Sequence, residues 1–268
     1  MCLATVLSSV AQDSSGFKRI EDQLNYHLSR IQYWSGHREY SDAVDTYDSI
    51  DVENKIFIRE LVAILNRYPA TLQYDFPALK KNGLTIANSI DGSLRFYSWD
   101  DQMGGTMRYY NSVAQFQTSR GIDTRIVNNT TEDGRSDEGV NVQRYDDIHV
   151  VNRGPKPLYL GIRGAQLQGY DRVRTVEAIT INDSELVFGA KMFKTEQGFR
   201  GSLSFEYPGC TDSEPCPDIF YIRDRQALYF PIVNWTWSSD STFHFSKQYT
   251  IYQFNGRYFE AKGTWQEK

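Results

Sequence analysis

The sequence predicts an α+β protein that is mostly antiparallel β, with an N-terminal helical pair followed by a β-meander. Two observations predict this class. Up to residue 83, apolar residues recur at the spacing of an amphipathic helix, whereas from residue 84 onward apolar and polar residues alternate and turn-forming pairs become frequent. The meander is expected to close as a barrel, a sandwich or propeller-like sheets, and no fixed repeat period chooses among these three.

Length and composition fit a folded chain of three segments. The 268 residues are 40% hydrophobic and 14% aromatic, which is sufficient for a sizeable core. Residues 1–12 are predicted to be a signal-peptide remnant, residues 13–83 a helical N-terminal segment, and residues 84–268 an antiparallel β-domain.

The predicted signal-peptide remnant is MCLATVLSSVAQ. It is small and apolar and ends in Ser9-Val10-Ala11, which fits the small-x-small rule of signal peptidases, although no basic residue precedes its apolar part. A disordered or strand-forming N-terminus is the alternative. A signal peptide predicts a periplasmic or secreted protein.

Two helices are predicted in the N-terminal segment. The first covers residues 17–34 and ends at Gly36, and the second covers residues 52–68 and ends before Pro69, which cannot continue a helix. The first helix has one apolar stripe, formed by Ile20, Leu24, Leu28, Ile31 and Trp34.

Hairpins are predicted where turn residues separate two alternating segments. The segment after residue 84 holds about ten to twelve strands at the spacing typical of all-β domains. The four predicted hairpin turns are Asp91-Gly92, Asn182-Asp183-Ser184, Asp224-Arg225-Gln226 and Asn255-Gly256.

The cysteines predict one local disulfide. If residues 1–12 are removed, Cys210 and Cys216 remain, within the short loop PGCTDSEPCPD. An even number of cysteines in an exported chain is typical of a disulfide framework. Two reduced thiols would require a cytosolic location, and a zinc half-site is poorly supported because no second Cys or His pair lies nearby.

Charge and motifs exclude several functions. A net charge of −5 and a pI near 5.5 argue against nucleic-acid binding, which draws its affinity from excess Lys and Arg. No apolar run reaches the roughly 18 residues of a membrane span. The sequence contains no phosphate-binding loop, dinucleotide fingerprint, H-E-x-x-H or G-x-S-x-G motif, so neither a cofactor nor a metal is predicted.

The candidate ligand site is the loop of residues 99–107, between two aromatic-rich strands. Tyr97 and Trp99 are predicted to stack against a ligand, Asp100 and Asp101 to accept hydrogen bonds, and Arg108 to balance their charge. The alternative is a structural β-turn with a tryptophan that closes its base.

A carboxylate-pair hydrolase is the rival hypothesis, because two carboxyl groups suffice for glycoside hydrolysis. A further candidate pair is Asp147 and His149, which a strand would project to one face, as in a general base with its orienting carboxylate. The candidate carboxylates are Asp100, Asp101, Asp146, Asp147 and Glu206, and the tryptophans that could stack on sugar rings are Trp99, Trp235 and Trp237.

The segment FYSWD followed by GGTMRYYN, in residues 96–111, resembles uncharacterised exported β-rich proteins of Bacteroidetes-type bacteria. The preceding residues 68–100 and the terminal IYQFNGRYFEAKG are similar to the same group. The resemblance implies export and a layout of helices followed by strands. No activity of that group can be carried over to this chain.

Together these observations predict a non-enzymatic glycan- or protein-binding module of the cell envelope. The alternatives are a carboxylate-pair hydrolase that acts on envelope polysaccharide and an inhibitor or immunity-type protein. The expected partner is a glycan or another protein, and the aromatic residues, 18 Tyr, 15 Phe and 5 Trp, are the material of its binding face if some of them are exposed.

Overall fold

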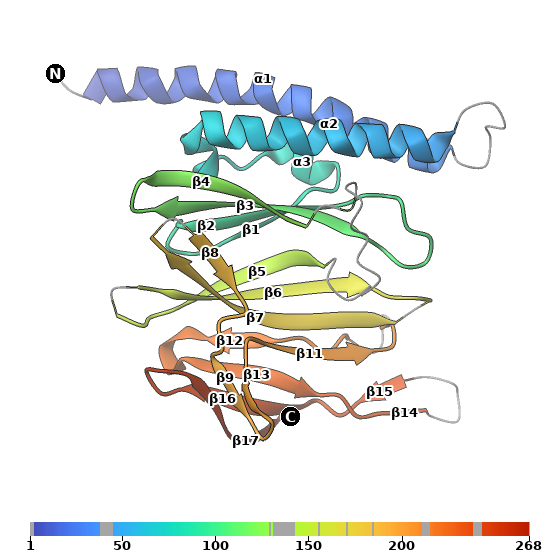
Figure 1. Cartoon of the computed structure of the whole chain (residues 1–268), viewed down its shortest axis with the longest axis vertical. Coiled ribbons are helices and arrows are strands. Elements are labelled where there is room, and N and C mark those ends of the chain that lie inside the picture. Colours follow the sequence, from blue (N-terminus) through green and yellow to red (C-terminus); the bar gives the residue numbers. More distant parts are fainter. Residues whose placement is uncertain are drawn as a thin grey trace.

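The computed structural model describes residues 3–37, 45–128, 130, 143–154, 156–169, 171–183, 185–210, 215–237 and 243–267. Within these ranges, side chains are described from Gly16 onward, except those of residues 235–237 and 243–244. The described chain forms four layers, in which a helical pair lies on a stack of three β-sheets (Figure 1). No helix in these ranges is long and apolar enough to cross a membrane.

The helical layer consists of α1 (Leu3–Gly36) and α2 (Thr46–Arg67), followed by η1 (Pro69–Gln73) and the short α3 (Pro77–Lys81). The predicted helices are confirmed, and they end where Gly36 and Pro69 were expected to end them. Both begin earlier than predicted. The backbone of α1 is helical from Leu3, so the predicted boundary after residue 12 falls within a continuous helix.

The earlier start of α2 has a capping residue as its cause. The Asp45 side chain accepts hydrogen bonds from the backbone N–H groups of Tyr47 (3.0 Å) and Asp48 (3.2 Å). An aspartate in this position satisfies amide donors that have no partner within the helix. The cap moves the start of α2 to Thr46, six positions before the predicted residue 52.

The first sheet lies under the helices. Its strands are β1 (Thr85–Asn88), β2 (Leu94–Asp100), β3 (Tyr110–Thr118) and β4 (Gly121–Asn128), paired antiparallel in that order. Its helix-facing side shares one apolar cluster with the helical pair. Buried members of that cluster include Leu24, Leu28, Phe57, Leu61, Tyr97, Trp99 and Val113.

The second sheet packs on the other side of the first. Its order is β11-β7-β6-β5 with β8 added to β7, and the stacked rings of Phe96 and Tyr145, 3.8 Å apart, join the two sheets. Its strands are β5 (Arg144–Val151), β6 (Leu158–Gln166), β7 (Arg172–Asn182), β8 (Glu185–Phe188) and β11 (Ser202–Tyr207).

The third sheet forms the far end of the stack, in the order β10-β9-β17-β16-β13-β12 (Figure 1). Its inner face packs on the second sheet, where Phe193, Leu228 and Phe259 meet Leu160 and Val176. Its strands are β9 (Phe193–Thr195), β10 (Gly198–Arg200), β12 (Phe220–Ile222), β13 (Ala227–Ile232), β16 (Gln248–Phe254) and β17 (Phe259–Gln266), with η2 (Arg223–Arg225) between β12 and β13. A separate hairpin pairs β14 (Trp235–Trp237) with β15 (Phe243–Phe245).

The predicted class, mostly antiparallel β with an N-terminal helical pair, is confirmed. The four predicted turns connect β1 to β2, β7 to β8, β12 to β13 and β16 to β17. The described residues form 17 strands, more than predicted, because several are only three or four residues long. None of the sheets in the described ranges closes on itself, and their strand orders are linear.

Candidate functional site

The predicted ligand loop lies at the helix-covered end, and its tryptophan belongs to the core. The Trp99 side chain is 1% exposed and packs edge-on against Phe57 of α2, with ring centroids 4.8 Å apart. Its indole Nε1 donates a hydrogen bond to Asn54 Oδ1 at 2.9 Å. A ring enclosed in this way has no face for a ligand, so the predicted stacking role of Trp99 is corrected to a structural one.

The same correction applies to Tyr97, which is fully buried. Its hydroxyl donates to Gln115 Oε1 at 2.9 Å, and Gln115 Nε2 in turn donates to the Leu65 carbonyl at 3.0 Å and to Thr71 Oγ1 at 2.9 Å. Burial raises the pKa of Tyr97 to about 12. Tyr97 therefore anchors the helical layer to the first sheet.

The acidic residues of the loop shape its turn. Asp101 is 1% exposed and accepts a hydrogen bond from the Met103 amide at 2.7 Å. A Cβ atom on Gly104 would lie 2.0 Å from the Met107 carbonyl oxygen, so this turn requires glycine there. The structure thus favours the alternative that the sequence left open, a structural turn closed by a tryptophan.

Asp100 and Arg108 are the two predicted site residues that remain partly accessible. Asp100 accepts a hydrogen bond from the Gln102 amide at 2.8 Å, and its Oδ2 lies 3.5 Å from Arg108 Nη1. The predicted charge balance between these side chains is therefore present. A pair engaged at the rim of a buried turn provides no pocket of its own.

The other predicted carboxylates lie in separate places. Asp147 Oδ2 is 3.4 Å from His149 Nε2, which confirms that the two side chains share a face, and burial lowers the pKa of His149. Asp146 is engaged by two arginines, and the Glu206 side chain is exposed on β11. The side chains of Trp235 and Trp237 lie outside the described part of the chain.

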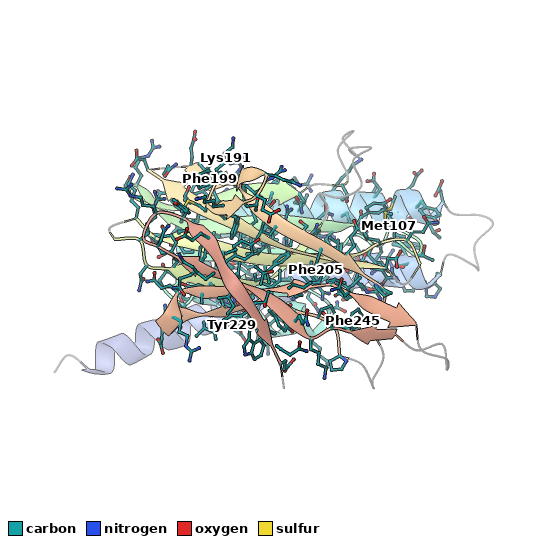
Figure 2. All side chains as sticks on the ribbon, turned by 90° about the horizontal axis from the view of Figure 1, so that it is seen from below. Met107, Lys191, Phe199, Phe205, Tyr229 and Phe245 are labelled. Carbon is teal, nitrogen blue, oxygen red and sulfur yellow. A yellow bond between two sulfur atoms is a disulfide. The ribbon has the colours of Figure 1, made fainter. Side chains whose placement is uncertain are left out.

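A different surface, at the opposite end of the stack, gathers aromatic side chains. We call it the outer aromatic face. It is the side of the third sheet that points away from the second sheet, and Figure 2 views the molecule from that end, with Tyr229 labelled. Its members are Phe220, Ile222, Tyr229, Tyr249, Ile251 and Trp265.

Strand register brings these rings together. Tyr249 is the cross-strand partner of Trp265, and Phe220 is the partner of Tyr229. The Trp265 ring lies 5.6 Å from Tyr229 and 5.5 Å from Tyr249, at interplanar angles of 86° and 44°. Trp265 is 40% exposed and Phe220 39% exposed, whereas the two tyrosines beneath them are buried.

A pocket of about 240 Å³ adjoins the outer aromatic face. Phe220 and Tyr249 belong to both, and the polar side chains of Lys247, Gln248 and Glu267 stand at the pocket. The Cys210–Cys216 disulfide, predicted from the sequence and confirmed here with its Cα atoms 5.3 Å apart, holds the loop that contributes another wall. That wall consists of Pro215, Cys216 and Pro217.

A larger hollow of about 980 Å³ lies along the opposite edge of the third sheet. It runs between the β9–β10 hairpin and β11, and two carboxylates, Glu196 and Glu260, line it together with Tyr252. This groove is open and mainly polar. Because two carboxylates line it, this groove is relevant to the rival hypothesis of a carboxylate-pair hydrolase.

Sequence reasoning did not single out Phe220, Tyr229, Tyr249 or Trp265. One signal was present, since β13 and β16 carry apolar residues on both faces, in ALYFPI and QYTIYQF. Such strands are normally covered on both sides. Only their inner side meets another sheet, so the doubly apolar pattern marks a face available to a partner.

Within the described ranges, no group of three or more His, Cys, Asp or Glu side chains is arranged to hold a metal ion. Comparison with known proteins found no match for this chain among protein-family models, curated proteins or solved structures.

Proposed function

We propose that this protein is a non-enzymatic glycan-binding module that works outside the cytoplasm, in the periplasm or as a secreted protein, and that sugars bind on the outer aromatic face. The observation that carries the proposal is the exposure of Trp265 (40%) and Phe220 (39%) on a sheet face beside a pocket with polar side chains. Exposed apolar patches rimmed by polar groups mark ligand or partner sites.

The chemistry of the face suits a sugar ring. A pyranose has an apolar side made of C–H groups and a rim of hydroxyls, so it needs an aromatic surface and hydrogen-bonding groups close together. Trp265 and Phe220 supply the aromatic surface. Lys247, Gln248 and Glu267 supply donors and acceptors at the adjoining pocket.

The pocket beside the outer aromatic face favours a soluble oligosaccharide as the ligand. A pocket of about 240 Å³ is suited to a projecting group of the ligand more than to a broad, flat protein partner.

Location outside the cytoplasm is supported by the disulfide. Cys210 and Cys216 are bonded, and structural disulfides persist mainly in oxidising compartments. The resemblance of residues 96–111 to exported Bacteroidetes-type proteins points the same way.

The carboxylates predicted for the rival hydrolase, Asp100, Asp101, Asp146, Asp147 and Glu206, do not line the larger groove, where Glu196 and Glu260 form a different pair. A glycosidase of this kind needs a general acid whose pKa is raised. Hydrogen bonds from Lys262 (2.8 Å) and Asn255 (3.4 Å) lower the pKa of Glu260 instead. The shift has the wrong direction for a general acid but suits the second, ionised carboxylate of such a pair, so a hydrolase at this groove would need Glu196 as its acid.

Affinity electrophoresis tests the proposal. The native protein is run through gels that contain a soluble β-glucan, xylan or mannan, together with the variants Trp265→Ala and Phe220→Ala. We expect at least one polysaccharide to retard the native protein, and both variants to lose at least about tenfold in affinity, equivalent to about 1.4 kcal/mol. Phe199→Ala is the matched control, because Phe199 is 46% exposed on β10 and lies outside this face.

Retardation that persists in Trp265→Ala and Phe220→Ala would place the glycan elsewhere and overturn the site. Absence of retardation with every polysaccharide, together with co-purification of a protein that is lost in Trp265→Ala, would favour the inhibitor or immunity-type alternative. Release of reducing ends that Glu196→Gln abolishes would establish the hydrolase instead.

A further inference from the structure

A second cavity, which we call the arginine cavity, lies on the second sheet. Its volume is about 240 Å³, equal to roughly eight waters at about 30 Å³ each. Three arginines and one aspartate line it, and two tyrosines from other strands form its sides. These residues are Arg144, Arg172, Arg174, Asp146, Tyr110 and Tyr207.

Strand register builds the arginine cavity. Gly164 of β6 is the partner of Arg144 on β5 and of Arg174 on β7, so the two arginines flank a residue without a side chain. A Cβ atom on Gly164 would lie 2.9 Å from Arg174 Cδ. The glycine therefore leaves the space across which Arg174 reaches Asp146. One step further along the same face, Gln166 is the partner of Arg172.

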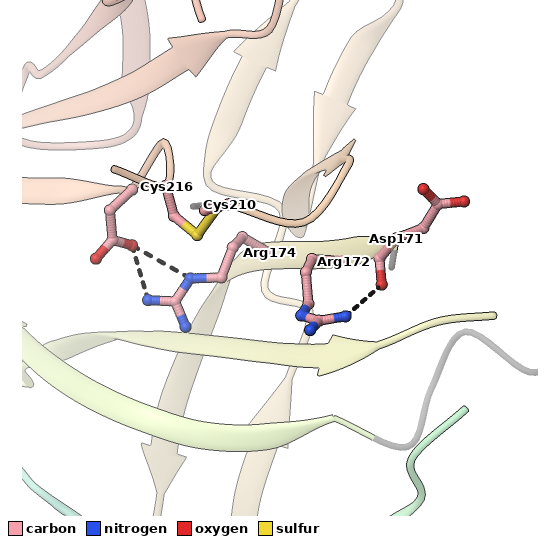
Figure 3. The surroundings of a disulfide bond; sticks show 6 residues. Asp171, Arg172, Arg174, Cys210 and Cys216 are labelled. Carbon is pink, nitrogen blue, oxygen red and sulfur yellow. Dashed lines mark hydrogen bonds and ion pairs between the residues drawn. A yellow bond between two sulfur atoms is a disulfide. The ribbon is translucent and has the colours of Figure 1, made fainter. Parts of the chain in front are cut away.

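Arg174 is the structural centre of this cluster. Its Nη1 donates to Asp146, and its Nη2 donates at 2.7 Å to Asp218, which follows the disulfide loop. Its side chain is only 17% exposed. Two carboxylates thus hold Arg174, and Figure 3 shows it beside Cys210 and Cys216.

Arg144 and Arg172 have a different character. The Arg144 side chain is 45% exposed, donates through Nε to Asp146 at 2.7 Å, and places its guanidinium 5.7 Å from the centre of the Tyr110 ring. Arg172 donates through Nη1 to the Asp171 carbonyl at 3.1 Å. A guanidinium carries five N–H donors, so Arg144 can bind a further acceptor that enters the cavity.

The charge of the cluster favours an anion. Three guanidinium groups face two carboxylates, those of Asp146 and Asp218, which leaves a local charge of +1 in a chain whose net charge is −5. The tyrosine sides shield the cavity, and burial raises the pKa of both Tyr110 and Tyr207. An anion in such surroundings is attracted more strongly than in open water.

We propose that the arginine cavity binds the carboxylate of a small organic acid, with Arg144 and Arg172 as its ligands and Tyr110 as the surface for the body of the molecule. A guanidinium matches a planar carboxylate with two parallel hydrogen bonds, and the Tyr110 ring gives the carbon skeleton of an organic acid a surface that an inorganic anion does not use. Arg174 positions the cluster without contacting the ligand. The proposal does not depend on the outer aromatic face.

Isothermal titration of the full chain at low salt tests this site, with glucuronate as the probe and glucose as its neutral counterpart. We expect glucuronate to bind at least about tenfold more tightly than glucose, and the double variant Arg144→Gln/Arg172→Gln to lose at least about tenfold of that affinity. Arg120→Gln/Arg153→Gln is the matched control, because it removes the same two charges from exposed positions outside the cavity. Circular dichroism confirms that each variant is folded.

Equal affinity for glucose and glucuronate would overturn the proposal, and so would an equal loss of affinity in Arg120→Gln/Arg153→Gln and Arg144→Gln/Arg172→Gln. Inorganic sulfate is the second probe, and binding as tight as that of glucuronate would replace a carboxylate site with a general anion site. Trp265→Ala should bind glucuronate like the native protein. This separates a failure of the arginine cavity from a failure of the proposed glycan site.

Discussion

Two aromatic clusters at opposite ends of the stack show how differently similar residues can be used. Trp99 on β2 and Trp265 on β17 both stand in hairpins with tyrosines on the same or a neighbouring strand. The first is 1% exposed and the second is 40% exposed. β2 lies under the helical pair, whereas β17 belongs to the third sheet at the other end (Figure 1). Coverage by another layer, more than residue type, decides which cluster becomes core.

The buried cluster around Trp99 also contains a network of side-chain hydrogen bonds. Asn54 of α2 is its centre, since its Oδ1 accepts from Trp99 Nε1 and Asn111 Nδ2, and its Nδ2 donates to the carbonyls of Ile50 and Asp101. Buried polar networks of this kind are stable only when every member is paired. They fix the orientation of α2 on the first sheet.

The largest expected effect is at Trp99. Trp99→Ala removes a buried indole and leaves a cavity against Phe57, so we expect a loss of about 3–5 kcal/mol in the free energy of unfolding. Urea denaturation followed by circular dichroism measures it. A loss below about 1 kcal/mol would break the comparison, because Trp99 would then behave like a surface residue.

A smaller loss is expected at Asn54. Asn54→Ala leaves the indole N–H of Trp99 without its acceptor in a buried place, which costs about 2–3 kcal/mol. Asn66→Ala on the exposed side of the same helix is the matched control, and it should change stability by less than about 0.5 kcal/mol. Equal effects of the two variants would show that the network adds nothing beyond helix propensity.

Much of the fold was predictable because it depends on local signals. Period-3.6 apolar spacing identified both helices, Pro69 set the end of the second, and Asp91-Gly92 and Asn255-Gly256 marked hairpins that the structure contains. The two cysteines, six residues apart, were close enough to pair without knowledge of the fold. The start of α2 was missed because its cap, Asp45, lies in an acidic stretch in which several residues suit a helix start equally well.

The candidate site was less predictable, because exposure depends on contacts between distant segments. FYSWD and ALYFPI are both rich in aromatic residues, and the docking of α2 on β2 is what buries the first of them. The arginine cavity needs the register of three strands, which places Arg144, Gly164 and Arg174 in one row although they are far apart in the chain. The doubly apolar pattern of β13 and β16 is a local signal for the outer aromatic face, but the side that stays uncovered and the row that builds the cavity are set by contacts between distant segments.

The disulfide should stabilise the third sheet near its loop and leave the helical layer unaffected. The Cys210→Ser/Cys216→Ser variant is expected to lose about 2 kcal/mol, the chain-entropy value for so short a loop. Hydrogen exchange should become faster in β12 and β13 near the loop and stay unchanged in α1 and α2. Faster exchange throughout α1 and α2 would show that the helical layer and the third sheet unfold as one unit. The two aromatic clusters would then differ in exposure but not in local stability.

Alkaline pH tests the burial of Tyr97 under the helical pair. The pKa of Tyr97 is raised to about 12 by burial, above the value near 10 expected for an unfolded tyrosine, so its contribution is present below pH 10 and is lost as the pH rises toward 12. Between pH 9 and 11.5 the native protein should lose about 2 kcal/mol more than Tyr97→Phe. Urea denaturation at both pH values measures the free energy of unfolding of each protein. An equal loss in the native protein and in Tyr97→Phe would contradict the burial of Tyr97.

The smallest change in stability is expected at Trp265, and it sharpens the comparison most. Trp265→Ala removes a ring that rests on Tyr229 and Tyr249 but is 40% exposed, so the loss in the free energy of unfolding should stay near about 1 kcal/mol or below. Glycan affinity should nevertheless fall at least about tenfold. A residue that matters little for folding and much for binding is what an uncovered aromatic face requires. If Trp265→Ala instead destabilises the chain as much as Trp99→Ala, the third sheet is covered in solution, and its aromatic residues serve the core as those of the first sheet do.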